Sequence, residues 1–238
     1  MSTPQASQRH FHSRLDALQD RLMEMAGLVE EALAAATKAV LERDPNVVEH
    51  ARRTDDRIDE LEVAIDEQVV ELLALHQPMA TDLRRIITTN KLSNDLERMG
   101  DHALNIAKAA KRLADTPPLP EVRELAEMVD VTREMVSDAL AAYVARNTGT
   151  ARLVCLTDDK VDELRRSMFR ILVTHMLEDP KRISGALELL LVSQNLERTG
   201  DLATNLAEDV VFLVEGRTIK HGADEDYDPT ETDAGSSE

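Results

Sequence analysis

Two segments of this chain, one hundred residues apart, are near copies of each other. "NDLERMGDHALNIAK" covers residues 94–108, "QNLERTGDLATNLAE" covers residues 194–208, and eight of the fifteen positions are identical. A second pair, "TDDRIDEL" at 54–61 and "TDDKVDEL" at 157–164, precedes them in the same order. A repeat of this length folds into the same structural unit each time it occurs, so the chain is predicted to contain two similar units.

Apolar residues recur at helical spacing within these units. In the first helix they alternate in steps of four and three and form one apolar stripe: Phe11, Leu15, Leu18, Leu22, Met25, Val29, Ala32 and Ala36. The stripe of the next helix contains Ala51, Ile58, Leu61, Ile65, Leu72 and Leu75. Aromatic residues make up only 2% of the chain, and no segment alternates apolar and polar residues as strands do. The chain is therefore predicted to be all-α.

Segments rich in turn-forming residues divide each unit into three helices. The breaks are "RDPN" at 43–46 and "HQP" at 76–78 in the first unit, and "NTG" at 147–149 and "EDP" at 178–180 in the second. "DTPPLP" at 115–120 separates the units. Short connections make successive helices antiparallel, at the roughly 20° crossing angle of heptad packing. We therefore predict two tandem antiparallel three-helix bundles, placed end to end.

These breaks also define the predicted domain order. A flexible N-terminus at 1–9 precedes the first bundle at 10–114, the linker at 115–120 leads to the second bundle at 121–215, and an acidic tail follows at 216–238. The tail is rich in acids and contains almost no large aliphatic residues. Because it cannot offset the entropy of ordering by burying apolar surface, it is predicted to be disordered.

Charge and composition narrow the functional classes. Acids outnumber bases by 46 to 28, a formal net charge of −18, which argues against non-specific nucleic-acid binding and against adhesion to an anionic membrane. The single cysteine, Cys155, excludes an intrachain disulfide framework. Neither a secretory signal nor a run of about 18 apolar residues is found. The sequence therefore predicts a soluble protein of the reducing cytoplasm.

Each unit carries two acidic pairs at i,i+4 spacing, on its second and third helices. Residues four apart project from one face of a helix, and the short turn between these helices makes them neighbours. Like charges at this spacing cost a helix about 0.2–0.5 kcal/mol per pair. Carboxylate-rich sites suit hard cations such as Mg²⁺, Ca²⁺, Mn²⁺ or oxidised iron, and Asn94, Asn105 and Asn205 would add amide oxygens. The predicted metal ligands are Asp55, Asp59, Glu97 and Asp101 in the first unit and Asp158, Asp162, Glu197 and Asp201 in the second.

A glycine lies between the two acids of each third helix, at Gly100 and Gly200. Inside a helix a glycine costs roughly 1 kcal/mol relative to alanine. The missing Cβ lets a bound ion or a neighbouring backbone come close. Close helix packing without a metal explains the glycines equally well, so they do not decide the question.

Two other interpretations of the acids remain open. The acids could form solvated flanks, or they could pair with nearby bases: Arg57, Arg98, Lys160 and Arg198. They could also belong to a ferritin-like metallo-oxidase, but no histidine follows a glutamate at i,i+3, as those di-iron sites require. Nothing else in the sequence indicates an enzyme. The second unit is the weaker metal candidate, because Glu62 and Asp66 extend the first acidic stripe, whereas Arg165 and Phe169 occupy the matching positions.

At these motifs the chain resembles a known family. The paired "LERxGDxAxN" segments, the paired "DDxxDEL" segments and the two three-helix units look like the PhoU family over about residues 10–214. The resemblance implies a cytoplasmic, homodimeric regulatory accessory of bacterial phosphate uptake, and no enzyme. It also implies multinuclear metal clusters on the acidic pairs just named, with iron, manganese, magnesium, calcium or zinc as the candidate metals.

The resemblance further implies partners. PhoU-like proteins are implicated in signalling between the phosphate ABC transporter, through its ATPase subunit, and a membrane sensor histidine kinase. They repress uptake and the phosphate-starvation response when phosphate is plentiful. We therefore expect a negative regulator of phosphate homeostasis that meets membranes only peripherally, through these complexes, and binds no nucleic acid. The alternative is a structural helical scaffold with solvent-exposed acidic faces and no metal role.

Overall fold

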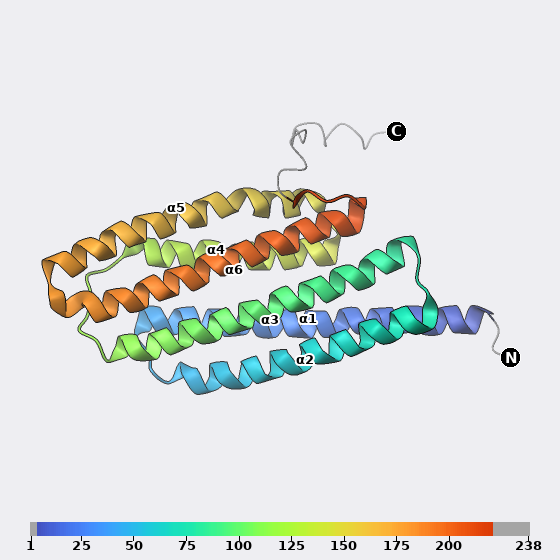
Figure 1. Cartoon of the computed structure of the whole chain (residues 1–238), viewed down its shortest axis with the longest axis horizontal. Helices are drawn as coiled ribbons and strands as arrows, with labels where there is room; N and C mark the ends of the chain where they lie inside the picture. Colours follow the sequence, from blue (N-terminus) through green and yellow to red (C-terminus); the bar gives the residue numbers. More distant parts are fainter. Residues whose placement is uncertain (1–3, 221–238) are drawn as a thin grey trace.

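The computed structural model describes residues 4–220, and the side chains within that range from residue 9 onward. Six α-helices and one short 3-10 helix are present in this range, and no strand (Figure 1). The elements are α1 Pro4–Glu42, α2 Val47–His76, α3 Ala80–Ala114, α4 Arg123–Ala145, α5 Thr148–Glu178, η1 Pro180–Arg182 and α6 Ile183–Glu215. The all-α prediction is confirmed. None of the described helices is long and apolar enough to cross a membrane.

Each repeat forms one antiparallel three-helix bundle, α1–α3 and α4–α6 (Figure 1). The predicted end-to-end arrangement is wrong, because the bundles lie side by side and α3 packs along α6 as extensively as along α1. The third helix of each repeat has more than the single apolar stripe that a surface helix needs. The additional buried surface comes from small residues, among them Ala103, Ala107 and Ala110 in α3 and Ala203 and Ala207 in α6.

The contacts between α3 and α6 run antiparallel. Lys91 Nζ lies 3.0 Å from Asp209 Oδ1, and Arg112 Nε donates to Glu188 Oε1 at 2.8 Å. Later residues of α3 thus meet earlier residues of α6. Because these two helices repeat each other at an offset of one hundred residues, an approximate two-fold axis relates the two bundles.

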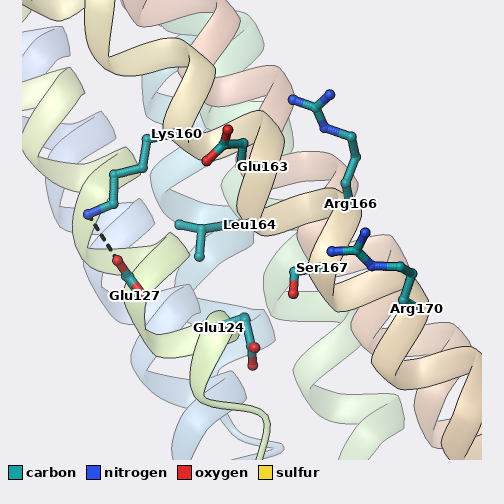
Figure 2. Close-up of a pocket in the computed structure, with 8 residues that line it drawn as sticks. All are labelled: Glu124, Glu127, Lys160, Glu163, Leu164, Arg166, Ser167 and Arg170. Atoms are coloured by element: carbon teal, nitrogen blue, oxygen red, sulfur yellow. Dashed lines mark ion pairs between the residues drawn. The ribbon is translucent and has the colours of Figure 1, made fainter.

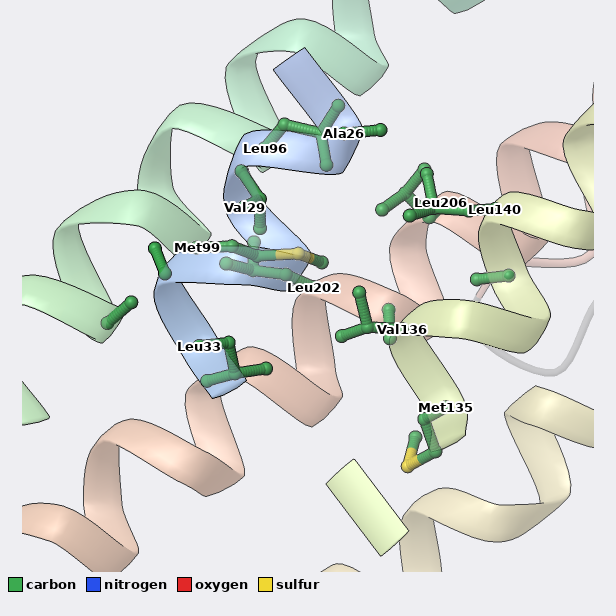
Figure 3. Packing of buried hydrophobic residues seen from close by; sticks show 14 of the residues in the cluster. Ala26, Val29, Leu33, Leu96, Met99, Met135, Val136, Leu140, Leu202 and Leu206 are labelled. Carbon is green, nitrogen blue, oxygen red and sulfur yellow. The ribbon is translucent and has the colours of Figure 1, made fainter. Parts of the chain in front are cut away.

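A continuous hydrophobic core runs through both bundles. Figure 3 shows Leu33 of α1 and Met99 of α3 near Leu202 of α6 and Val136 of α4, and all four side chains are buried. The first predicted stripe is confirmed, since its eight residues from Phe11 to Ala36 are all buried. Tertiary packing of these faces, more than helix propensity, stabilises helices in a folded chain.

Two helix ends differ from the prediction. The helix α1 begins at Pro4, so most of the expected flexible N-terminus is helical. At the end of α2, Leu75 was predicted on the apolar stripe but is 64% exposed. Its neighbour His76 points inward instead, with its ring centroid 5.1 Å from that of Phe11. A straight helix drifts by about 20° per heptad from a strict seven-residue repeat, which moves the stripe by one position.

The start of the predicted acidic tail is described, and the rest is not. Gly216 ends α6 in the left-handed conformation, with φ +73°, and its N–H donates to Phe212 O at 2.9 Å. The chain then reaches Lys220, whose Nζ lies 3.8 Å from Asp209 Oδ1. The prediction of disorder falls mainly on residues 221–238, which lie outside the described residues.

Candidate metal centres

The two glycines mark where α2 meets α3 and where α5 meets α6. A Cβ placed on Gly100 would lie 3.0 Å from Ile58 Cδ1 and 3.5 Å from Asp55 Oδ1. A Cβ placed on Gly200 would lie 3.6 Å from Asp158 Oδ1 and 3.6 Å from Val161 Cγ1. Both motif pairs therefore meet in the same way, with the first acid of the second helix opposite the glycine of the third. The glycine of the first bundle permits the closer approach.

Folding concentrates negative charge in the first bundle. Burial, followed by the charges of Asp59 and Asp101, raises the pKa of Asp55 to about 6. Burial and then the charge of Asp101 also raise the pKa of Asp59 and of Glu97. Among the described residues, no base lies within ion-pair distance of any of these four acids. The four predicted ligands therefore face one another without a neutralising partner.

The second bundle repeats this arrangement with one partial compensation. Burial, followed by the charges of Asp201 and Asp162, raises the pKa of Asp158 to about 6. Burial raises the pKa of Glu197 and of Asp201 as well. Arg165 Nε lies 3.6 Å from Glu197 Oε1, the one ion pair that the four acids make within the described range. The second group of acids is therefore less strongly charged than the first.

None of the four bases expected to pair with these acids forms an ion pair with them, although the charge of Arg198 partly opposes the rise in the pKa of Glu197 and of Asp201. Arg198 forms no ion pair with any acid of residues 9–220, and the other three pair outside the clusters: Arg57 with Glu24 and Glu60, Lys160 with Glu127, and Arg98 with Asp95. The interpretation that the acids pair with those bases is wrong. One base near the first cluster was missed. Lys108 lowers the pKa of Asp55, and its position one heptad after Asp101 could have revealed it.

The acids do not form a complete ligand shell in this structure. Among the described residues, no three His, Cys, Asp or Glu side chains are grouped so that they could hold one ion. Two features of the first cluster suit a hard cation: all of its predicted ligand atoms are oxygens, and a carboxylate oxygen beside it has no hydrogen-bond partner. Asp66 Oδ1 is buried without a hydrogen-bond partner, and burial, then the charges of Asp66 and Asp59, raise the pKa of Glu62. The acidic stripe of the first bundle is therefore longer than that of the second.

Comparison with known proteins identifies the family of these acidic bundles. The PhoU domain matches residues 22–110 and 125–210. The chain belongs to the PhoU family. The "Phosphate-specific transport system accessory protein PhoU homolog" of Clostridium acetobutylicum is 38% identical over 210 residues, 88% of this chain and 96% of that protein. The Aquifex aeolicus homolog is 40% identical over 207 residues, 87% of this chain and 94% of that protein.

Solved PhoU structures share the fold. The crystal structure of PhoU from Pseudomonas aeruginosa matches with a TM-score of 0.84 at 37% identity, covering 87% of this chain and all of that one. The phosphate transport system regulatory protein PhoU from Streptococcus pneumoniae matches with a TM-score of 0.80 at 27% identity, covering 87% of this chain and 98% of that one. The resemblance inferred from the doubled motifs is confirmed.

The two motif glycines of this PhoU-family chain should respond differently to alanine. Replacing Gly200→Ala gains up to about 1 kcal/mol of helix propensity, which is a rise of roughly 2–4 °C in melting temperature, because the new Cβ makes only ordinary contacts. Replacing Gly100→Ala should gain less or lose stability, since Ile58 is fully buried and must shift. Thermal denaturation of both variants measures this. Equal gains would contradict the closer approach in the first bundle.

Stability without metal should fall as pH rises through the raised carboxyl pKa values. The folded state holds protons on Asp55 and Asp158 up to about pH 6, whereas the unfolded state releases them near 3.8. The double variant Asp55→Asn/Asp158→Asn should therefore melt higher than wild type at pH 7, and the gap should narrow by pH 5. Melting curves in chelator at both pH values measure this difference in melting temperature. Burial lowers the pKa of His102, which makes stability rise with pH, but this effect is the same in wild type and variant and cancels in the difference. A gap that widens at pH 5 would contradict the assignment.

Proposed function

We propose that this PhoU-family chain is a metal-binding regulatory adaptor of phosphate homeostasis, and not an enzyme. One observation carries the metal part of the proposal. In each bundle two acidic pairs face each other across a glycine, and seven of the eight acids have no ion-pair partner among the described residues. Folding thus builds a concentration of negative charge that a bound cation would relieve.

The proposed ligands are the eight acids of the two clusters: Asp55, Asp59, Glu97 and Asp101, and Asp158, Asp162, Glu197 and Asp201. The oxygen-only donor set favours the harder candidates, magnesium, calcium, manganese and ferric iron, over zinc. The bound ion would hold the second and third helices of a bundle together and supply no reaction chemistry. Because Arg165 partly neutralises Glu197, the second bundle is the weaker centre.

The adaptor part rests on the family. Two relatives are named accessory proteins of the phosphate-specific transport system, and the Streptococcus pneumoniae structure is that of a phosphate transport system regulatory protein. We extend this role to the present chain as a cytoplasmic homodimer. It would link the ATPase subunit of the phosphate ABC transporter to a sensor histidine kinase and restrain uptake and the starvation response when phosphate is plentiful.

Deleting this gene in its native host tests the adaptor part. Phosphate uptake and phosphate-starvation genes should stay active in phosphate-replete cells, because the restraint on both is gone. The measurement is radiolabelled phosphate uptake together with starvation-gene transcripts, before and after complementation with the wild-type gene. Normal repression in the deletion strain would remove the functional assignment. Complementation with the Glu97→Gln/Asp101→Asn variant separates the two parts, since full rescue would show that signalling does not require the first metal centre.

A further inference from the structure

A groove of about 620 Å³ lies between α5 and α6 of the second bundle. Three arginines of α5 line it together with apolar surface, and no acid does: Arg165, Arg166, Arg170, Phe169 and, from α6, Leu190 and Gln194. The Phe169 side chain is 56% exposed. In a chain of net charge −18, the lining of this groove holds three cations, an exposed aromatic ring and no acid, and one of the cations, Arg165, is paired with Glu197 just outside it.

The fold does not require these residues at this place. The repeat pairs Asp55 of α2 with Asp158 of α5. The same offset assigns the four α5 residues that line the groove to four residues of α2: Glu62, Val63, Asp66 and Glu67. Those positions carry three acids and no base. Because both bundles pack in the same way at their glycines, the basic groove serves something other than packing.

Two of the arginines have no carboxylate partner. Within residues 9–220, neither Arg166 nor Arg170 forms an ion pair, and the one hydrogen bond of the Arg166 guanidinium is from Nε to the backbone oxygen of Asp162 at 3.1 Å. Figure 2 shows both side chains at a second, neighbouring pocket, which is also lined by Glu124, Glu127 and Glu163. Lys160 is paired with Glu127 there, whereas neither arginine forms an ion pair with these glutamates. Guanidinium groups bind carboxylates in charge-assisted, often bidentate pairs. The groove therefore suits an acidic segment that also carries an aromatic or aliphatic side chain.

The chain itself contains such a segment. Residues 221–238 read "HGADEDYDPTETDAGSSE", with seven acids, no lysine or arginine, and Tyr227 between Asp226 and Asp228. We infer that this acidic segment docks in the groove, with Tyr227 against Phe169 and the flanking carboxylates on Arg166 and Arg170. The acidic clusters repel the segment, so the acid-free groove is where its charge is compensated. The inference does not depend on metal binding.

The segment is long enough to reach the groove. Lys220 lies beside Asp209, and Gln194 is fifteen residues earlier on α6, about 22 Å away at the rise of an α-helix. Eighteen extended residues span up to about 60 Å. Tyr227 is seven residues beyond Lys220, so seven extended residues, up to about 25 Å, bring it to the groove along a nearly straight path beside α6, and the later acids reach further.

A tryptophan at the groove tests the inference, because the chain contains no other tryptophan. Phe169→Trp is introduced into the full chain and into a chain that ends after Lys220, both in chelator. We expect blue-shifted emission and weaker acrylamide quenching in the full chain than in the shortened one, independent of protein concentration. Adding a synthetic peptide of residues 221–238 to the shortened chain should restore the shift. In 1 M salt, where the Debye length is only about 3 Å, the difference should disappear.

Two variants serve as controls. Arg166→Glu/Arg170→Glu in the full-length reporter should lose the shift while melting as before, since both side chains are exposed. Val63→Trp places a reporter on α2 of the first bundle, at the 54% exposed position that matches Arg166, where removing residues 221–238 should change nothing. Identical emission of the full and shortened chains overturns the inference, and so does a shift that survives the arginine substitutions. A shift that grows with protein concentration overturns it as well, and assigns the groove to the tail of a second copy.

Discussion

Replacing Glu97→Gln and Asp101→Asn together should abolish most of the rise in melting temperature that we expect metal ions to give the wild-type chain. If an ion binds the folded state only, it stabilises that state by RT ln(1 + [L]/Kd), about 2.7 kcal/mol at a hundredfold excess over Kd. For a chain of this size that is a rise of roughly 5–11 °C. The amides keep the shape of the acids and remove their charge, so the loss reports on the ion and not on packing.

The same double change in the second bundle, Glu197→Gln with Asp201→Asn, should remove a smaller part of the rise. Arg165 already lies 3.6 Å from Glu197 and supplies part of the positive charge that an ion would bring. Chelator-treated protein, melted in increasing concentrations of each candidate ion, gives both shifts. Elemental analysis of protein purified without chelator identifies the bound metal.

Without metal, neither variant should be less stable than wild type. Each change removes mutual repulsion among acids that have almost no basic partners, so the metal-free melting temperature should stay or rise slightly. This separates a lost ion from a damaged fold. If every divalent ion stabilised wild type and both variants equally, the assignment of these acids as ligands would be wrong.

The helices could be predicted from the sequence, but the arrangement of the bundles could not. Heptad steps and proline breaks located all six helices, because a helix buries residues at fixed spacing. The side-by-side contact uses a second face of α3, made of residues such as Ala103 and Ala107. Alanine is common on both buried and exposed helix faces, so its presence did not reveal a second interface.

The sequence placed the acids on the correct helices, since i,i+4 spacing and a short turn leave little choice of face. It could not show which bases neutralise them. Arg57 lies two residues after Asp55 in the sequence but pairs with Glu24 on α1 and with Glu60. Such pairings depend on how each helix is rotated against its neighbours, and periodicity alone does not fix that rotation to within one side chain.

The ion pair between α3 and α6 could likewise not be predicted from the sequence, and its acid is buried although the Lys91 side chain is 44% exposed. The Asp209 side chain is 2% exposed, with Lys91 Nζ at 3.0 Å and Lys220 Nζ at 3.8 Å. A second acid adds to the charge, since burial and then the charge of Asp209 raise the pKa of Asp95 to about 6. Replacing Lys91→Leu should cost about 3 kcal/mol, because it leaves a buried carboxylate with only its more distant base.

The repeat supplies the matched control for this prediction. The approximate two-fold axis relates Lys91 and Asp209 to Leu191 and Ala109, two positions that carry no charge. The double variant Lys91→Leu/Asp209→Ala copies that apolar pair and should unfold within about 1 kcal/mol of wild type, as replacements of buried ion pairs by apolar groups often do. Chemical denaturation of wild type, both single variants and the double variant gives the coupling energy directly. Lys91 Nζ lies over the Phe212 ring, 5.1 Å from its centroid. If the double variant is as unstable as Lys91→Leu alone, the loss comes from this packing of the lysine side chain and not from an unpaired Asp209.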